Sequence, residues 1–213
     1  WQCSFEVLEM FSVLFPGQGS QHLGMGQFLF NNFQIAKETF EEASEAIKSD
    51  LKRLCFNGSD SELALTENTQ PCLLVTSVAT QRVLRKQMGV SYSIAAGHSI
   101  GEYAALVTAE AMPFASAMRA VRIRGQAMQS AVPVGDGGMF AVMGLDQGQI
   151  EQMCRYVVEK SGFGPLSPAN YNSPGQIVIS GNQKALDWLK NSFKPEELWP
   201  EIKRVKLIPL QVS

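Results

Sequence analysis

The residue with the clearest chemical potential is Ser99, which stands within the pentapeptide GHSIG at 97–101. In a G-x-S-x-G pattern the glycines permit a sharp turn from a strand into a helix, and the turn presents the serine as a nucleophile. A short apolar segment at 94–97 precedes the turn and a helical stretch follows it. The backbone N–H of Ile100 then stands at a helix N-terminus, where it can donate to an oxyanion. The sequence therefore predicts nucleophilic catalysis by Ser99.

A second chemical feature is the glycine-rich turn at 17–21, directly after an apolar segment at 11–15. The turn lacks the Lys-Ser/Thr pair of a phosphate-binding loop and the full G-x-G-x-x-G of a dinucleotide site. Loops that follow parallel strands open at the same edge of a sheet, so we expect this turn beside Ser99, where it would stabilise an oxyanion. A tight turn without any catalytic role explains these residues equally well.

Neither histidine is a convincing general base. His98 adjoins Ser99, but its side chain is expected to leave the turn in another direction, and nothing around His22 marks it as catalytic. The Ser…Asp…His order of esterases requires a histidine after the serine, and none follows Ser99. Both histidines are expected to serve packing or the surface.

Arginines on a helix predicted at 114–128 offer an anion site. Helical spacing places Arg122 and Arg124 at the two edges of an apolar stripe, and Arg119 toward solvent. An arginine beside a buried face needs an anionic partner. That partner is a protein carboxylate, which is the commoner case, or a substrate carboxylate held by two hydrogen bonds. Periodicity does not choose between Arg122 and Arg124.

Strands and helices alternate in the first part of the chain. The predicted elements are a strand at 11–15, helices at 36–47 and 70–88, a strand at 94–97 and a helix at 114–128. Pro71 is placed in the first turn of its helix. This alternation predicts a mostly parallel sheet with helices on both faces. With the sharp turn at Ser99, it indicates an α/β-hydrolase-like domain whose first part spans 10–135.

The pattern changes after the glycine-rich stretch at 133–138. The predicted elements are then a strand at 139–145, a helix at 150–158, strands at 167–171 and 176–180, a helix at 185–193 and a strand at 203–207. This β-α-β-β-α-β order is that of the ferredoxin-like split motif. We therefore expect an inserted ferredoxin-like small domain at 136–207, after which 208–213 return to the large domain.

Composition restricts the possible classes of protein. The 213 residues are 45% hydrophobic and 18% charged, as in ordinary globular domains. The formal charge of −2 argues against binding to nucleic acid or an anionic membrane, and the apolar runs are far shorter than the ~20 residues of a membrane span. Four dispersed cysteines indicate free thiols in a reducing compartment, without a disulfide or metal site; they are Cys3, Cys55, Cys72 and Cys154. We expect a cytoplasmic monomer.

The two ends of the chain carry separate expectations. Residues 1–9 lack the pattern of a signal peptide, and Met10 is expected to be a natural start that follows an extension. The last residues, 208–213, form a strand-like segment with no helix or cap after it, which indicates an interruption.

Together these segments resemble the malonyl-CoA:acyl carrier protein transacylases of fatty-acid synthesis and the related acyltransferase domains of polyketide synthases. The resemblance covers residues 11–213. The matching stretches are FPGQGSQHLGMG (15–26), TQPCLLVTSVA (69–79), AAGHSIGEYAALV (95–107), RIRGQAMQSAVPVGDGGMFAVMGL (122–145), NYNSPGQIVISG (170–181) and KRVKLIPLQVS (203–213).

The resemblance implies a role for each matching residue. Ser99 is similar to the nucleophile that takes malonyl from coenzyme A, and Gln18 with the backbone of Ile100 to the oxyanion hole. Arg124 is similar to the residue that pairs with the malonyl carboxylate, a choice that periodicity leaves open. Ile100 favours malonyl, because methylmalonyl-type domains tend to carry glutamine there. No cofactor is implied beyond the substrate malonyl-CoA.

The chain departs from the family in one respect. The family's general-base histidine lies just beyond the counterpart of 209–213, where this sequence stops. The resemblance implies that the complete protein transfers malonyl to the phosphopantetheine thiol of acyl carrier protein by ping-pong chemistry, and that these 213 residues are nearly inactive.

Three alternatives stay open. One is a stand-alone acyltransferase that serves a polyketide synthase. Another is an α/β-hydrolase esterase, against which Arg124 and the glycine-rich turn argue. The third is an inactive module that only docks carrier protein, against which the intact Ser99, Gln18 and Arg124 argue.

Overall fold

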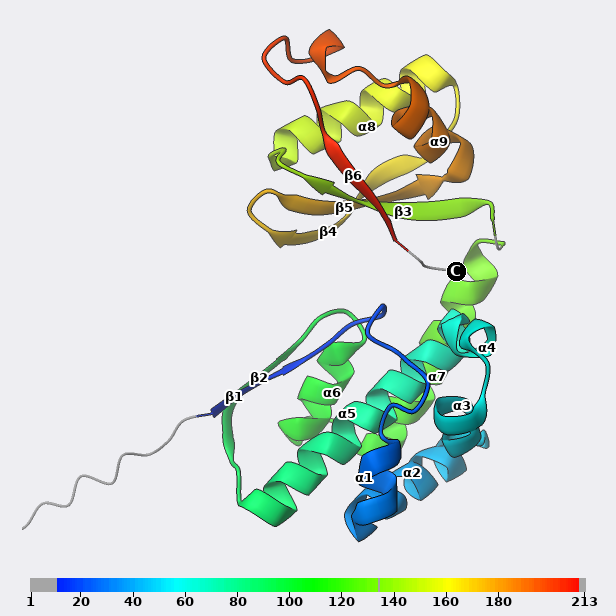
Figure 1. Cartoon of the computed structure of the whole chain (residues 1–213), viewed down its shortest axis with the longest axis vertical. Helices are drawn as coiled ribbons and strands as arrows, with labels where there is room; N and C mark the ends of the chain where they lie inside the picture. The colour runs from blue at the N-terminus through cyan, green and yellow to red at the C-terminus, as the bar shows by residue number, and fades with distance from the viewer. Residues whose placement is uncertain (1–10, 134, 211–213) are drawn as a thin grey trace, which may run out of the picture. The chain divides into compact units, whose positions relative to one another are not determined.

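The structure is a computed structural model that describes residues 11–133 and 135–210. The chain divides into two compact units, Trp1–Gln129 and Ser130–Ser213 (Figure 1). This division lies before the expected boundary at 135/136, close to the end of a long helix. The expected start at Met10, the extension before it and residues 211–213 lie outside the described residues.

The first unit holds a parallel pair of strands and most of the helices. Its elements are β1 (Phe11–Phe15), α1 (Gln27–Asn32), α2 (Gln34–Ile47), α3 (Leu51–Asn57), α4 (Asp60–Ala64), α5 (Thr66–Met88), β2 (Tyr92–Gly97), α6 (Gly101–Thr108) and α7 (Phe114–Ala131), whose last residues fall in the second unit. Strands β1 and β2 pair in parallel, with Phe15 opposite Gly97, which confirms the predicted parallel sheet.

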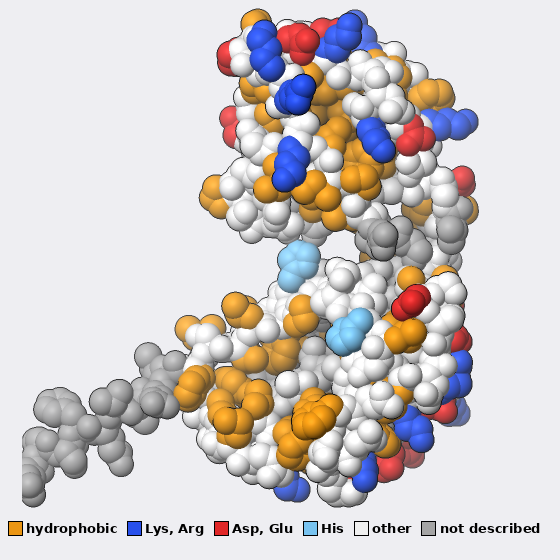
Figure 2. Space-filling view, viewed as in Figure 1, with side chains coloured by type: hydrophobic (Ala, Val, Ile, Leu, Met, Phe, Trp, Pro, Cys, Tyr) orange, Lys and Arg blue, Asp and Glu red, His pale blue; other side chains and the backbone are white. Residues whose placement is uncertain are grey.

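The two faces of the parallel sheet differ. Helix α6 packs against both strands, and Val13, Phe15 and Ala95 join the hydrophobic core. On the other face Leu14 is 76% exposed and Ile94 is 62% exposed. Figure 2 shows hydrophobic side chains over the part of the unit where Figure 1 places these strands. Helices were expected on both faces, whereas among the described residues helix α6 covers one.

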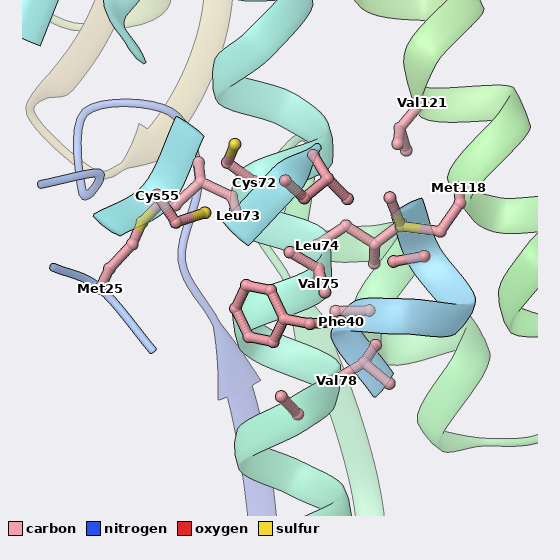
Figure 3. Close-up of a cluster of buried hydrophobic side chains, with 14 of the residues drawn as sticks. Met25, Phe40, Cys55, Cys72, Leu73, Leu74, Val75, Val78, Met118 and Val121 are labelled. Carbon is pink, nitrogen blue, oxygen red and sulfur yellow. The ribbon is translucent and has the colours of Figure 1, made fainter. Parts of the chain in front are cut away.

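Helix α5 runs through the centre of the first unit. Its apolar residues pack against Phe40 of α2 and Met118 and Val121 of α7 (Figure 3). Phe40 is 1% exposed, and burying an aromatic side chain of this kind stabilises a fold by about 1.5–3 kcal/mol. The same helix contacts α1, α2, α3, α4 and α6, so it fixes the positions of the elements around it.

Helix α5 begins earlier than predicted. It starts at Thr66 instead of residue 70, and Pro71 lies inside the helix and not in its first turn. A proline inside a helix leaves the carbonyl four residues earlier without its N–H donor. Here that carbonyl, on Glu67, accepts a hydrogen bond of 2.7 Å from Arg122 Nη1 of α7. A tertiary contact therefore permits the earlier start.

Three short helices of the first unit were not predicted, namely α1, α3 and α4. Each is too short to show a helical period in its apolar residues. Two of them begin at side-chain caps: Asp50 accepts from the Arg53 N–H, and Ser59 accepts from the Glu62 N–H.

The second unit has the predicted β-α-β-β-α-β order. Its elements are β3 (Gly137–Met143), α8 (Gln147–Ser161), β4 (Leu166–Ser173), β5 (Gln176–Asn182), α9 (Gln183–Ser192), the 3₁₀ helix η1 (Pro195–Glu197) and β6 (Lys206–Leu210). The strands form an antiparallel sheet in the order β4-β5-β3-β6. Helices α8 and α9 contact each other and share a core with the sheet. The predicted fold class is therefore confirmed.

The last strand differs from its prediction. Strand β6 spans 206–210 instead of 203–207, and Pro209 pairs opposite Phe140 of β3. The small domain was expected to end at residue 207. Strand β6 lies at an edge of the sheet, where the missing N–H of a proline is tolerated. Residues 208–210 thus belong to the small sheet and do not return to the large domain.

None of the helices in the described ranges combines the length and hydropathy needed to cross a bilayer.

Candidate active site

The sharp turn at Ser99 has the geometry expected of a nucleophile elbow. Ser99 has a φ of +53°, in the left-handed region that a side chain rarely occupies. A Cβ added to Gly97 would lie 2.0 Å from the Gly101 carbonyl carbon, and one added to Gly101 would lie 2.4 Å from the Phe15 carbonyl oxygen. Both glycines are therefore required by the close approach of β1, β2 and the start of α6.

Two backbone donors lie at the same edge of the parallel sheet. Gln18 and Ile100 each stand three residues after the paired positions Phe15 and Gly97, and the His98 N–H donates to the Phe15 carbonyl at 3.0 Å. Within the described part of the chain, the backbone N–H groups of Gln18 and Ile100 donate to no protein acceptor. Free N–H groups beside a nucleophile are suited to stabilise a developing oxyanion.

Arg124 lies beside the nucleophile. Its Nη2 donates to Ser99 Oγ at 3.1 Å, and its Nη1 donates to Gln70 Oε1 at 2.7 Å. In residues 11–133 and 135–210, no carboxylate lies within 4.0 Å of this half-buried guanidinium. A half-buried cation with only neutral partners is a favourable site for an anion.

The neighbouring arginines have structural partners. Arg122 donates to the Glu67 carbonyl at 2.7 Å and to Asn68 Oδ1 at 3.1 Å, and its Nη2 lies 3.5 Å from Glu67 Oε2. Exposed Arg119 donates to Ser116 Oγ at 3.1 Å. The structure therefore separates Arg122, which holds α5 to α7, from Arg124, which reaches the serine.

Gln70 is a residue of the site that sequence reasoning missed. Its side chain is fully buried, with Oε1 accepting from Arg124 and Nε2 donating to Met128 Sδ at 3.2 Å. The contact with Nη1 turns the guanidinium so that Nη2 faces Ser99. The available signal was a glutamine directly before the apolar run 71–75.

The two histidines lie at the surface. Both are exposed (Figure 2), and His22 Nδ1 lies 3.5 Å from the Ser20 carbonyl oxygen. The His98 imidazole covers Gly17, where an added Cβ would lie 2.4 Å from Nδ1. Across the described ranges, Ser99 Oγ makes its hydrogen bond with Arg124 and none with a histidine.

No metal site is evident in this part of the structure. In the described ranges, no group of three or more His, Cys, Asp or Glu side chains is arranged to hold a metal ion.

Comparison with known proteins identifies the family. Residues 13–206 match the family described as "Acyl transferase domain". The malonyl CoA-acyl carrier protein transacylase of Salmonella typhimurium is 48% identical over 181 residues, which are 84% of this chain and 57% of that protein. The transacylase of the same name from Bacillus subtilis is 44% identical over 202 residues, which are 95% of this chain and 61% of that protein.

Solved structures give the same result. The crystal structure of malonyl CoA-acyl carrier protein transacylase from Clostridium perfringens is 39% identical, with a TM-score of 0.79, and the match covers 96% of this chain and 61% of that one. A malonyl-transacylase in complex with a type II polyketide synthase acyl-carrier protein is 41% identical, with a TM-score of 0.82 over 96% of this chain and 63% of that one. The chain thus spans roughly three fifths of the relatives it matches. From these matches, the chain belongs to the acyl transferase domain family.

Proposed function

We propose that the complete protein transfers a malonyl group from malonyl-CoA to the phosphopantetheine thiol of an acyl carrier protein. The observation that carries the proposal is the position of Arg124, a guanidinium with neutral partners whose Nη2 lies 3.1 Å from Ser99 Oγ. A malonyl thioester presents a carboxylate close to its reacting carbonyl, so one substrate can engage both side chains. An acyl group without a carboxylate would leave Arg124 without an ionic partner.

The reaction has two half-reactions with the same chemistry. Ser99 Oγ attacks the thioester carbonyl and forms a C–O bond, which gives a tetrahedral intermediate. The intermediate then collapses as the C–S bond breaks, and coenzyme A leaves as the thiol with the serine proton. The carrier thiol then attacks the malonyl-serine ester, and the proton returns to Ser99. In both tetrahedral intermediates, the N–H groups of Gln18 and Ile100 are the proposed oxyanion donors.

A general base is needed to take the proton from Ser99 and to deliver it to the leaving thiol. The family resemblance assigns it to a histidine beyond the segment that ends at residue 213, outside this chain. We therefore propose that acylation by these 213 residues is slow, because a general base typically contributes about 10²–10⁴-fold to such a step.

The identity of the carrier protein is a separate matter. The Salmonella and Bacillus relatives are named for the acyl carrier protein, whereas one structural relative is bound to a type II polyketide synthase carrier. We propose the fatty-acid carrier as the natural acceptor, with a polyketide carrier as the second candidate.

The test is a transfer assay with radiolabelled malonyl-CoA and the holo-form of each carrier protein in separate reactions. This chain is added at the same concentration as the carrier. We expect label on the carrier, none with Ser99→Ala, and more label on the fatty-acid carrier. Release of free malonate without labelled carrier would instead identify an esterase. Carrier binding without any acylated Ser99 would identify a docking module.

A further inference from the structure

We propose that Thr66, at the start of α5, is a positioning residue that holds the glycine-rich turn in its oxyanion-binding geometry through the side chain of Gln18. The proposal deepens the proposed function and rests on it. The hydrogen bond from the Gln18 side chain is the contact through which Thr66 would act on the site.

A single long-range hydrogen bond carries the inference. Gln18 Nε2 donates to Thr66 Oγ1 at 3.1 Å across 48 residues of sequence. Thr66 is 1% exposed, and its β-branched side chain has few available rotamers. A buried, stiff hydroxyl gives the Gln18 amide a fixed acceptor. Holding this amide restricts the movement of the Gln18 backbone and therefore of its N–H.

The turn itself offers only local support. Ser20 donates to the Gly17 carbonyl through Oγ at 2.8 Å and through its backbone N–H at 3.4 Å, and the Gly19 N–H donates to Gln21 Oε1 at 2.7 Å. Gly19 has a φ of +107°. The hydrogen bond to Thr66 joins this turn to α5, and the His98 imidazole packs over Gly17. Loss of the bond to Thr66 would free the Gln18 side chain to move.

Helix α7 holds the backbone of Thr66 in place. Its backbone N–H, one of those that a helix start leaves unpaired, donates to Gln129 Oε1 of α7 at 2.9 Å. Helix α7 approaches so closely that a Cβ on Gly125 would lie 2.8 Å from Glu67 Cα and 3.0 Å from the Thr66 carbonyl oxygen. The start of α5 is therefore clamped and can serve as a rigid reference.

The same helix start also serves the carboxylate site. Gln70 follows Thr66 by about one helical turn and accepts from Arg124. The first turns of α5 thus contact the side chains of both Gln18 and Arg124. This arrangement explains why polar side chains occupy these two buried positions of α5.

The test compares three variants. Thr66→Val keeps the shape and removes the acceptor, while Thr66→Ser keeps a hydroxyl. Thr69→Val is the matched control, because Thr69 is equally buried on α5 and its hydroxyl donates to the carbonyls of Leu63 and Leu65. Two quantities are measured: the rate of Ser99 malonylation over a range of malonyl-CoA concentrations, and the ¹⁵N side-chain amide signals of Gln18, assigned with Gln18→Ala.

We expect Thr66→Val to shift the Gln18 amide signals. It should also slow malonylation about 10- to 100-fold at saturating malonyl-CoA, since misplacing a reacting or stabilising group by about 1 Å can cost 10²-fold. The concentration that gives half the maximal rate should change little, because Arg124 is untouched. Thr66→Ser should restore most of the rate, and Thr69→Val should retain it.

A rate for Thr66→Val equal to wild type would overturn the proposal, as would equal slowing by Thr69→Val or no rescue by Thr66→Ser. Failure of the wild-type chain itself to form malonyl-Ser99, even after hours with excess malonyl-CoA, would count against the proposed function and not against the role of Thr66. The Gln18 signals then decide on Thr66 by themselves, and unchanged signals in Thr66→Val would overturn its role.

Discussion

At the scale of single residues, the account depends on Arg124 being matched to a carboxylate. Replacing Arg124 with Ala removes both donors, and hydrogen bonds to a charged group are worth about 1.5–3 kcal/mol. We therefore expect Arg124→Ala to weaken malonyl-CoA binding about 10- to 100-fold and to leave acetyl-CoA binding unchanged, as measured by titration calorimetry. Arg119→Ala, which removes the same charge from an exposed position, serves as control. Equal losses for both acyl groups would refute the assignment.

Gln70 should act on the same binding step. Gln70→Leu keeps the volume and removes the acceptor that orients Arg124 Nη1. Because a net hydrogen bond is worth about 1 kcal/mol, we expect malonyl-CoA binding to weaken roughly fivefold, with no effect on acetyl-CoA. Gln81→Leu is the control, since Gln81 is also buried on α5 and has no contact with Arg124. A similar loss in Gln81→Leu would show that Gln70 acts through stability alone.

These residues also show what a sequence can reveal about a site. The elbow at Ser99 could be predicted because a local constraint, the close approach at Gly97 and Gly101, fixes both glycines. The choice between Arg122 and Arg124 could not be made from periodicity, since it depends on Glu67, a residue 55 positions away. Gln70 was missed because a buried amide leaves no periodic signal. The assignments of Ser99, Gln18, Ile100 and Arg124 to catalysis stay predictions until acylation is measured.

At the scale of elements, the elbow should tolerate no side chain at its glycines. A Cβ at Gly97 would overlap backbone atoms of Gly101, which cannot move aside as a flexible side chain can. We expect Gly97→Ala to lower the free energy of unfolding by about 3 kcal/mol or more, as measured by urea denaturation. Gly148→Ala, in the first turn of α8, should be neutral or slightly stabilising. A Gly97→Ala protein of wild-type stability would contradict the described elbow.

The contact between α5 and α7 gives a second prediction. Arg122→Met leaves the Glu67 carbonyl without a donor, because Pro71 cannot supply one. We expect a loss of about 1–3 kcal/mol in the free energy of unfolding, with malonyl-CoA binding unchanged. Arg119→Met should change stability by less than about 0.5 kcal/mol. If Arg122→Met instead abolished malonyl-CoA binding, the separation of the two arginines would be wrong.

The boundaries of elements were predicted less well than their types. Helix α5 starts early and β6 runs late for the same reason, namely that a tertiary or edge position accommodates a proline. The sequence pattern places Pro71 in a first turn and ends the last strand at residue 207. Neither prediction takes account of the tertiary surroundings, which are the hydrogen bond from Arg122 in the first case and the edge position of β6 in the second.

At the scale of the molecule, each unit has its own hydrophobic core. The buried thiol of Cys154 is a probe of the stability of the second unit. Burial raises the pKa of the Cys154 thiol to about 12. The thiol stays protonated when folded and ionises near pH 8.5 when unfolded, so stability is retained below that pH and is lost as pH rises toward 12. We expect the free energy of unfolding of the second unit to fall over this range, and to fall less in Cys154→Ala. An identical pH dependence in both proteins would contradict this.

The order of elements was sufficient to predict both sheets. Alternation gave the parallel pairing of β1 with β2, and the β-α-β-β-α-β order gave the antiparallel sheet, because short connections leave few topologies. The covering of the parallel sheet could not be predicted in the same way. Leu14 and Ile94 are apolar, as expected of a sheet that is covered on both faces. In the part of the chain that the structure describes, both side chains are nevertheless exposed.

The central claim is that Ser99 takes the malonyl group, and the intact mass of the protein tests it most directly. The protein is incubated for hours with excess malonyl-CoA, with acetyl-CoA in parallel, because acylation without the family's base is expected to be slow. The account predicts the added mass of one malonyl group with malonyl-CoA, far less adduct with acetyl-CoA, and none in Ser99→Ala. An adduct that persists in Ser99→Ala, or that forms equally from acetyl-CoA, would contradict it.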